Sequence, residues 1–127
     1  MQALVVDDSS TMRRILTKIL DRLDFPNSVE AASGLEALKC LESAPVDLII
    51  VDWNMPGMTG LEFVRAIRST AATKDIPVIM VTGNAASDDI VRAVQVGIDG
   101  YIVKPFRIET LREKIAVIMG NRSQSAA

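Results

Sequence analysis

The sequence contains no histidine and only one cysteine, Cys40. Without histidine the chain cannot build a histidine metal site, a Ser-His or Cys-His catalytic pair, or a phosphohistidine of its own. Any histidine chemistry must therefore come from a partner. A single cysteine excludes an internal disulfide and favours a reducing compartment, so we expect a cytoplasmic protein.

Long apolar runs and blocks of one charge are also missing. Apolar residues make up 49% of the 127 residues, the length of one domain. They come in runs far shorter than the about 20 residues of a membrane span, and the N-terminus lacks the basic region of a signal peptide. The net charge of −2 includes no basic block. We therefore expect binding to neither membranes nor nucleic acid.

Five short apolar runs alternate with segments of helical spacing. We expect strands at residues 3–6, 28–32, 48–51, 78–81 and 101–103. One helical face between the first two strands is formed by Met12, Ile15, Leu16, Ile19, Leu20 and Leu23. Four more helices are expected at residues 34–43, 60–69, 87–96 and 108–119. Alternation of this kind predicts an α/β fold, a doubly wound five-stranded parallel sheet with five helices.

Local signals support the expected helix ends. Ser33 with Glu36, and Thr59 with Glu62, have the spacing of capping boxes. Gly120 is the predicted stop of the last helix. We therefore expect one domain over residues 1–120, followed by a disordered tail at residues 121–127 that is rich in Ser, Ala and Gln.

Polar side chains follow four of the five predicted strands. Asp7 and Asp8 follow the first strand, Asp52 the third, Thr82 the fourth and Lys104 the fifth. Asp and Thr are common in turns, so any one of them could be purely structural. Their shared position at the carboxyl ends of parallel strands, where such sheets bind ligands, predicts a functional site.

The residue types indicate the chemistry of that site. Three carboxylates in one crevice repel each other, and a divalent cation resolves the conflict. Oxygen ligands without His or Cys select Mg²⁺, with Mn²⁺ or Ca²⁺ as alternatives. A carboxylate beside such an ion can attack phosphorus and become an aspartyl phosphate. Lys104 would supply a fixed cation, and Thr82 a hydroxyl donor, to the transferring phosphoryl group.

Five stretches resemble the response-regulator receiver family. They are VVDD at residues 5–8, STMRR at 10–14, DWNMP at 52–56, VT at 81–82 and GYIVKPF at 100–106. The set in this order frames nearly the whole chain. The resemblance implies a flavodoxin-like fold with the strand order 2-1-3-4-5.

The resemblance also implies a role for each matching residue. Asp52 would be the phosphoacceptor. Magnesium would be bound by the carboxylates of Asp8 and Asp52, by the backbone carbonyl of Asn54, and by Asp7 through water. These assignments come from the family, and the residues by themselves indicate only an acidic site.

Further roles follow from the same likeness. Thr82 and Lys104 would grip the phosphoryl group, and Tyr101 would turn inward as Thr82 moves toward it. A cis bond is expected before Pro105. Asn54 and Asn84 occupy positions that tune the phosphate lifetime, and GNA at residues 83–85 departs from the enteric chemotaxis pattern.

The implied function is a response regulator of a two-component system, phosphorylated by a sensor histidine kinase and acting in chemotaxis. Its output face would be formed by the fourth helix, fifth strand and fifth helix. The fourth helix has more apolar side chains than one buried face needs, namely Ile90, Val91, Val94 and Val96, so some of them could contact a partner. The expected partner there is a flagellar motor switch protein or a phosphatase. We expect a monomer that is no enzyme beyond its own phosphoryl transfer and dephosphorylation.

Several alternatives stay open at this point. The chain could be a phosphate sink, an adaptor in another two-component pathway, or a receiver cut from a longer regulator. An aspartyl-phosphate phosphatase is disfavoured because Asn54 stands where such enzymes have a second acid. A flavodoxin-like flavin carrier is disfavoured because no Ser/Thr/Gly-rich phosphate loop follows the first strand.

Overall fold

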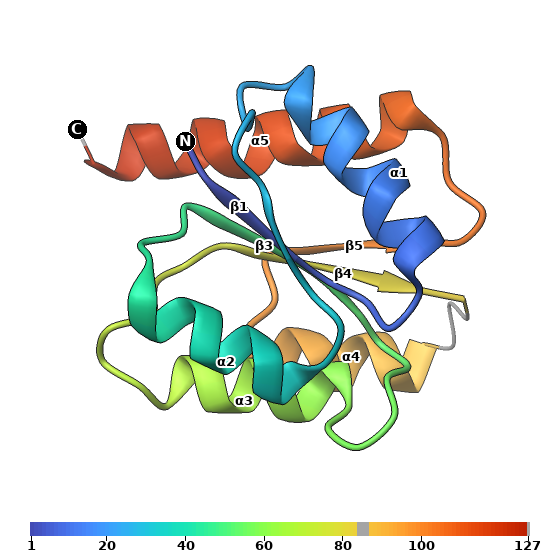
Figure 1. The fold of residues 1–127 in the computed structure, drawn as a ribbon. Coiled ribbons are helices and arrows are strands. Elements are labelled where there is room, and N and C mark those ends of the chain that lie inside the picture. The colour runs from blue at the N-terminus through green and yellow to red at the C-terminus, as the bar shows by residue number, and fades with distance from the viewer. Residues whose placement is uncertain (84–86, 127) are drawn as a thin grey trace.

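The computed structural model describes residues 1–83 and 87–126, with the backbone alone at residues 87 and 121–126. In this part of the chain five strands alternate with five helices (Figure 1). The strands are β1 (Ala3–Val6), β2 (Val29–Ala31), β3 (Leu48–Asp52), β4 (Val78–Thr82) and β5 (Gly100–Val103). The helices are α1 (Ser10–Asp21), α2 (Gly34–Ser43), α3 (Gly60–Arg68), α4 (Ser87–Val96) and α5 (Ile108–Ala126).

The strands form one parallel sheet in the order β2-β1-β3-β4-β5. Helices α1 and α5 cover one face, and α2, α3 and α4 cover the other (Figure 1). This arrangement confirms the predicted doubly wound fold and its strand order. Winding reverses between β1 and β3, and in such sheets the ligand crevice opens at that point, outside the carboxyl ends of the strands.

The sheet separates two hydrophobic cores. Successive side chains of a strand point to opposite faces. Ala3 and Val5 of β1 therefore pack in the core beneath α1 and α5. Leu4 and Val6 pack in the core beneath α2, α3 and α4. Burial on both faces explains why the central strands are continuously apolar in the sequence.

Side-chain caps fix where the helices begin. Thr59 accepts a hydrogen bond from the amide of Glu62, and the Glu62 carboxylate accepts one from the amide of Thr59. The capping box predicted for α3 is thus complete. Ser33 accepts from the amide of Glu36 at the start of α2. Because α3 begins soon after β3, its cap also holds the loop that follows Asp52.

Two helices differ from expectation. Ile15 is 45% exposed, although its spacing placed it on the buried face of α1. The apolar stripe of α1 is wider than the area that the sheet covers. The predicted stop of the last helix is wrong as well, since α5 continues through Gly120 to Ala126. One glycine inside a helix costs only about 1 kcal/mol relative to alanine.

The proposed division into a domain of residues 1–120 and a disordered tail of residues 121–127 stays a prediction. Within residues 1–83 and 87–126, no helix combines the length and apolar character needed to cross a membrane.

Candidate functional site

The carboxyl edge of the sheet gathers the polar side chains that the sequence predicted there. Asp7 and Asp8 follow β1, Asp52 and Thr82 are the last residues of β3 and β4, and Lys104 follows β5. Parallel pairing places β3 between β1 and β4. Asp52 therefore lies at the centre of the edge, between the acidic residues and the threonine.

Three carboxylates form a compact cluster at this edge. One oxygen of each of Asp7, Asp8 and Asp52 lies within 4.8 Å of the others. Asp7 and Asp52 are buried, whereas Asp8 is exposed. Two buried acids next to a third are unfavourable when all are charged, so a cation placed here would stabilise their charged forms.

Burial governs how these acids titrate. It raises the pKa of Asp52, against the opposing effect of the Lys104 ammonium, and repulsion from Asp8 raises that pKa further. Burial also raises the pKa of Asp7, while its hydrogen bond from the Ser9 amide works in the opposite direction. The folded chain therefore resists carrying both negative charges.

One oxygen of the cluster has an unmet hydrogen-bonding requirement. Asp7 Oδ1 accepts a 2.9 Å hydrogen bond from the Ser9 amide. Asp7 Oδ2 is the only buried side-chain nitrogen or oxygen in the described part of the chain without a hydrogen-bond partner. Lys104 Nζ lies 4.0 Å from it, too far for a hydrogen bond. A buried carboxylate oxygen without a hydrogen bond, on a residue clustered with two other carboxylates, fits a hard divalent cation or one of its water ligands.

Lys104, directly after β5, points toward this cluster. Its Nζ atom lies 3.3 Å from Asp52 Oδ1, and its amide donates a 2.7 Å hydrogen bond to the carbonyl of Thr82. The Lys104–Pro105 peptide bond is cis, as predicted. The lysine is therefore held in the crevice beside Asp52, where it can contact anything bound to that carboxylate.

Comparison with known proteins decides the family. The response regulator receiver domain family matches residues 3–116. The chain belongs to this family. Chemotaxis protein CheY of Pseudomonas aeruginosa is 49% identical over 118 residues, covering 93% of this chain and 95% of that protein. Chemotaxis protein CheY1 of Helicobacter pylori is 45% identical over 121 residues, covering 94% and 98%.

Solved structures agree with the sequence relatives. Chemotaxis response regulator CheY4 of Vibrio cholerae has a TM-score of 0.86 at 37% identity, covering 92% of this chain and 97% of that one. A receiver domain protein of Clostridium thermocellum has a TM-score of 0.87 at 26% identity, with coverages of 99% and 98%. The receiver is thus of the CheY type, which agrees with phosphorylation-activated two-component signalling in chemotaxis and favours none of the alternatives.

The two predicted switch residues of this receiver lie in different environments. Thr82 is buried at the end of β4. Tyr101, on β5, is 37% exposed, and Lys114 Nζ lies 5.6 Å from the centre of its ring. Tyr101 is paired in register with Met80, two residues before Thr82. The ring therefore has an outward position from which a turn toward β4 is possible.

Of the two asparagines predicted to tune the phosphate lifetime, only Asn54 lies within the described residues. Asn54 is exposed in the loop after β3, and its amide hydrogen-bonds the Asp52 carboxylate. It therefore lies beside the acidic cluster. Asn84 lies outside the described residues.

Part of the apolar surplus predicted for α4 is on the surface of the receiver. Val91 and Val94 are 52% and 58% exposed. Ile90 and Val96 are partly buried. Two valines of α4 are therefore exposed to solvent.

Sequence reasoning missed the role of Gly60 in shaping the site. Its amide donates a 3.0 Å hydrogen bond to the carbonyl of Trp53, which closes the loop between β3 and α3. A Cβ atom at Gly60 would lie 2.5 Å from the carbonyl oxygen of Asp52. Only glycine allows α3 to begin so close to the end of β3. The signal was a glycine directly after the N-cap Thr59.

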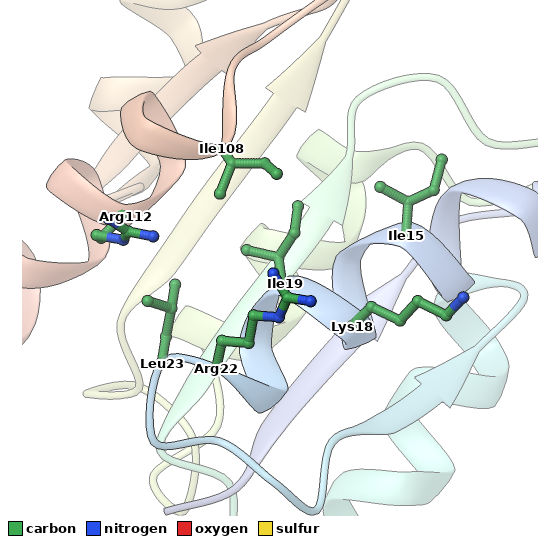
Figure 2. Close-up of a pocket in the computed structure, with 7 residues that line it drawn as sticks. All are labelled: Ile15, Lys18, Ile19, Arg22, Leu23, Ile108 and Arg112. Carbon is green, nitrogen blue, oxygen red and sulfur yellow. The ribbon is translucent and has the colours of Figure 1, made fainter.

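A surface groove between α1 and α5 is a second feature of the receiver that the sequence did not predict. Figure 2 shows α1 and α5 side chains on either side of it. Its volume is about 250 Å³, and its lining residues are Ile15, Lys18, Ile19, Arg22, Leu23, Ile108 and Arg112. A neighbouring hollow shares Ile15, Ile19 and Ile108 and extends to Lys104 and Pro105. An apolar surface with a basic rim therefore leads up to the acidic site.

Proposed function

We propose that this receiver accepts a phosphoryl group on Asp52 from a sensor histidine kinase and acts in a chemotaxis pathway. The observation that carries the proposal is the surroundings of Asp52. Its buried carboxylate lies 3.3 Å from Lys104 Nζ and within 4.8 Å of the oxygens of Asp7 and Asp8. A nucleophile, a fixed cation and ligands for a metal ion are thus together at one edge of the sheet.

The proposed metal ion is Mg²⁺, with Mn²⁺ as a substitute. Asp8 and Asp52 would bind it through carboxylates, Asn54 through its backbone carbonyl, and Asp7 through a water molecule. When bound, Mg²⁺ supplies positive charge that cancels the repulsion of the acids and attracts phosphoryl oxygens. The Asp7 Oδ2 atom, buried without a hydrogen-bond partner, supports this assignment.

The transfer itself needs only residues of this site and a donor. One carboxylate oxygen of Asp52 attacks the phosphorus of a kinase phosphohistidine, and the P–N bond breaks. The imidazole leaves with the electron pair and takes up a proton, while an acyl phosphate forms on Asp52. Lys104 and the Thr82 hydroxyl contact the phosphoryl oxygens. Transfer of the phosphoryl group to Asp52 and later hydrolysis of the acyl phosphate are the only reactions that we propose for the chain.

Phosphorylation would act as a switch on the outer face. It adds roughly −1.5 to −2 charges at one point. In the proposal Thr82 moves toward them, and Tyr101 turns inward into the space that is vacated. Shifting a population from 1:99 to 99:1 requires about 5.5 kcal/mol of differential interaction. The face of α4, β5 and α5, with Val91 and Val94 exposed, would then bind a flagellar motor switch protein or a phosphatase.

The kinase would dock in the groove between α1 and α5, away from the exposed valines of α4. The groove between α1 and α5 is apolar and has Lys18, Arg22 and Arg112 among its lining residues. Such a surface suits an amphipathic helix with acidic side chains along its edges. Because the adjoining hollow reaches Lys104, a helix docked there could present a phosphohistidine to Asp52.

Further assignments belong to this proposal. Asn54 and Asn84 set the lifetime of the phosphate. The protein acts as a monomer in the cytoplasm, and it binds neither nucleic acid nor membranes. Size-exclusion chromatography with light scattering tests the monomer directly.

Mass spectrometry after treatment with acetyl phosphate and Mg²⁺ tests the central claim. We expect one added phosphoryl group in the wild type and none in Asp52→Asn. Omitting Mg²⁺ should greatly slow the reaction. An unmodified wild type, or equal modification of the variant, would contradict the proposal. Affinity capture with and without a stable phosphoryl mimic then identifies the pathway through the partner that is retained.

A further inference from the structure

Arg13 connects three elements behind the acidic site. Its Nη1 atom donates a 2.6 Å hydrogen bond to the backbone carbonyl of Asp7. Its Nε atom donates to Glu30 Oε1, on the edge strand β2, at 3.1 Å. The side chain is only 16% exposed. The guanidinium group thus joins α1, the loop after β1, and β2.

These bonds complete a set of attachments around Asp7. The Asp7 amide donates to the carbonyl of Ala31 at 3.1 Å. The Asp7 Oδ1 atom accepts from the amide of Ser9 at 2.9 Å. With its carbonyl held by Arg13, Asp7 keeps a single polar atom without a hydrogen bond, the Oδ2 atom, which lies 4.0 Å from Lys104 Nζ. The orientation of that atom is therefore set by contacts on every other polar group of the residue.

The position of the Asp7 carbonyl also determines the position of the Asp8 backbone. A peptide unit is planar, so fixing the carbonyl of Asp7 fixes the amide and Cα position of Asp8. Asp8 is the exposed member of the cluster. Repulsion among three carboxylates pushes this loop outward. A hydrogen bond from a guanidinium group opposes that movement before any cation arrives.

We propose that Arg13 is a positioning residue that holds the Asp7–Asp8 loop ready to bind a divalent cation. This inference rests on the proposed function of the acidic cluster. Groups that orient metal ligands from behind typically contribute 10- to 100-fold to metal affinity. A lysine would not replace Arg13, because the two hydrogen bonds leave from different nitrogens of one planar group. Glu30 supports the guanidinium group and should contribute less.

Titration of the purified protein with magnesium chloride tests this proposal. Trp53 adjoins Asp52 in the chain and provides a fluorescence signal for the site. We expect Arg13→Ala to weaken binding about 10-fold or more, Arg13→Lys to recover little of the loss, and Glu30→Gln to cause a smaller loss. The matched control is Arg14→Ala, which removes the same charge from an exposed neighbour on the same helix.

Two further measurements separate positioning from general destabilisation. Urea unfolding checks that the variants are folded at the temperature of the titration. NMR spectra of the metal-free protein should show changed amide signals at Asp7 and Asp8 in Arg13→Ala, and unchanged signals there in Arg14→Ala. With acetyl phosphate, Arg13→Ala should need more Mg²⁺ for half the maximal rate, while its rate at saturating Mg²⁺ recovers.

The inference is overturned if Arg13→Ala binds Mg²⁺ within twofold of the wild type, or if Arg14→Ala loses as much. Either result would leave the proposed function standing, because the wild type would still bind the ion. A wild type that does not bind Mg²⁺ at all would overturn both.

Discussion

Charged side chains at the two edges of the sheet differ in how fully their hydrogen bonds are satisfied within the protein. At the amino edge Arg68 donates hydrogen bonds to the carbonyls of Gly97, Lys74 and Ile76 and to Asp99 Oδ2. Asp99 Oδ2 also accepts from the amide of Val78 at 2.8 Å. At the carboxyl edge Asp7 Oδ2 has no hydrogen-bond partner, and burial raises the pKa of both Asp7 and Asp52.

This difference distinguishes charges that stabilise the fold from charges that we propose bind a ligand. The Arg68–Asp99 pair satisfies its hydrogen bonds within the protein, so it stabilises the ends of α3, α4 and the strands beside it. In the acidic cluster one buried carboxylate oxygen has no hydrogen bond within the protein, and a bound cation would supply the missing interaction. Functional sites commonly reduce stability in this way, because groups prepared for a ligand are poorly satisfied without it.

The largest expected effect comes from breaking the amino edge. Arg68→Ala removes the donor shared by three backbone carbonyls and Asp99. We expect the free energy of unfolding to fall by about 3 kcal/mol, because partly buried acceptors lose their partner. Urea unfolding measures the change. Arg65→Ala, at an exposed position on the same helix, should cost less than about 0.5 kcal/mol. A loss below 1 kcal/mol for Arg68→Ala would contradict the structural role.

The next effect concerns the ligand of the carboxyl edge. Mg²⁺ at 100 times its dissociation constant should raise the free energy of unfolding by about 2.7 kcal/mol. Urea unfolding with and without Mg²⁺ measures this increment. It should persist in Arg68→Ala, because the two edges are separate, and should shrink in Asp52→Asn. Equal increments in wild type and Asp52→Asn would place the ion elsewhere.

The same substitution should have opposite signs at the two edges. Asp52→Asn removes a buried charge whose pKa burial has raised, so we expect the metal-free protein to gain about 1 kcal/mol. Asp99→Asn weakens charge-assisted bonds to Arg68 and the Val78 amide, so we expect a loss of about 1 kcal/mol. Thermal and urea unfolding without Mg²⁺ compare them. Two changes of the same sign would show that the edges do not differ as described.

The smallest effect is the pH dependence of that gain. In the folded state the pKa of Asp52 lies above the ordinary value of 3.8. Between pH 3.8 and this raised pKa, the folded state binds a proton at Asp52 more tightly than the unfolded state does. The Asp52 carboxyl group therefore lowers the free energy of unfolding as pH rises through this range. The advantage of Asp52→Asn should therefore be full above the raised pKa and disappear toward pH 3.8. Urea unfolding of both proteins across this range measures it.

A pH-independent difference between the two proteins would contradict that assignment. Glu62 contributes in the opposite direction, since its hydrogen bonds with Thr59 lower its pKa. It is unchanged between the two proteins, so it cancels in the comparison. Mg²⁺ binding should weaken as pH falls through the same window, because protons compete for Asp52 and Asp7.

Much of the fold could be predicted because its signals are local. Strand runs, helical spacing and the Thr59–Glu62 cap depend on residues close together in the chain, and the structure confirms them. Convergence of Asp7, Asp52 and Lys104 was also predictable, since the carboxyl ends of parallel strands share one edge. The Asp52 role was taken from family resemblance, because an acidic cluster alone does not reveal which carboxylate is the nucleophile.

The remaining features depend on contacts between distant segments. Exposure of Ile15 depends on how much of α1 the sheet covers, and the end of α5 is not decided by Gly120 alone. The Arg13 contacts with Asp7 and Glu30 join residues on a helix, a loop and a strand. No spacing in the sequence shows which of the neighbouring arginines, Arg13 or Arg14, turns toward the site.

The sequence by itself determined the order of the elements, the two faces of each central strand, and the types of side chain at the carboxyl edge. These follow from local conformational preference and from burial of apolar surface. Only the tertiary structure decided which carboxylate oxygen lacks a hydrogen bond, how close Lys104 lies to Asp52, and which arginine bonds the carbonyl of Asp7. Those outcomes depend on distances of a few ångströms between segments far apart in the chain, which packing of the whole domain sets.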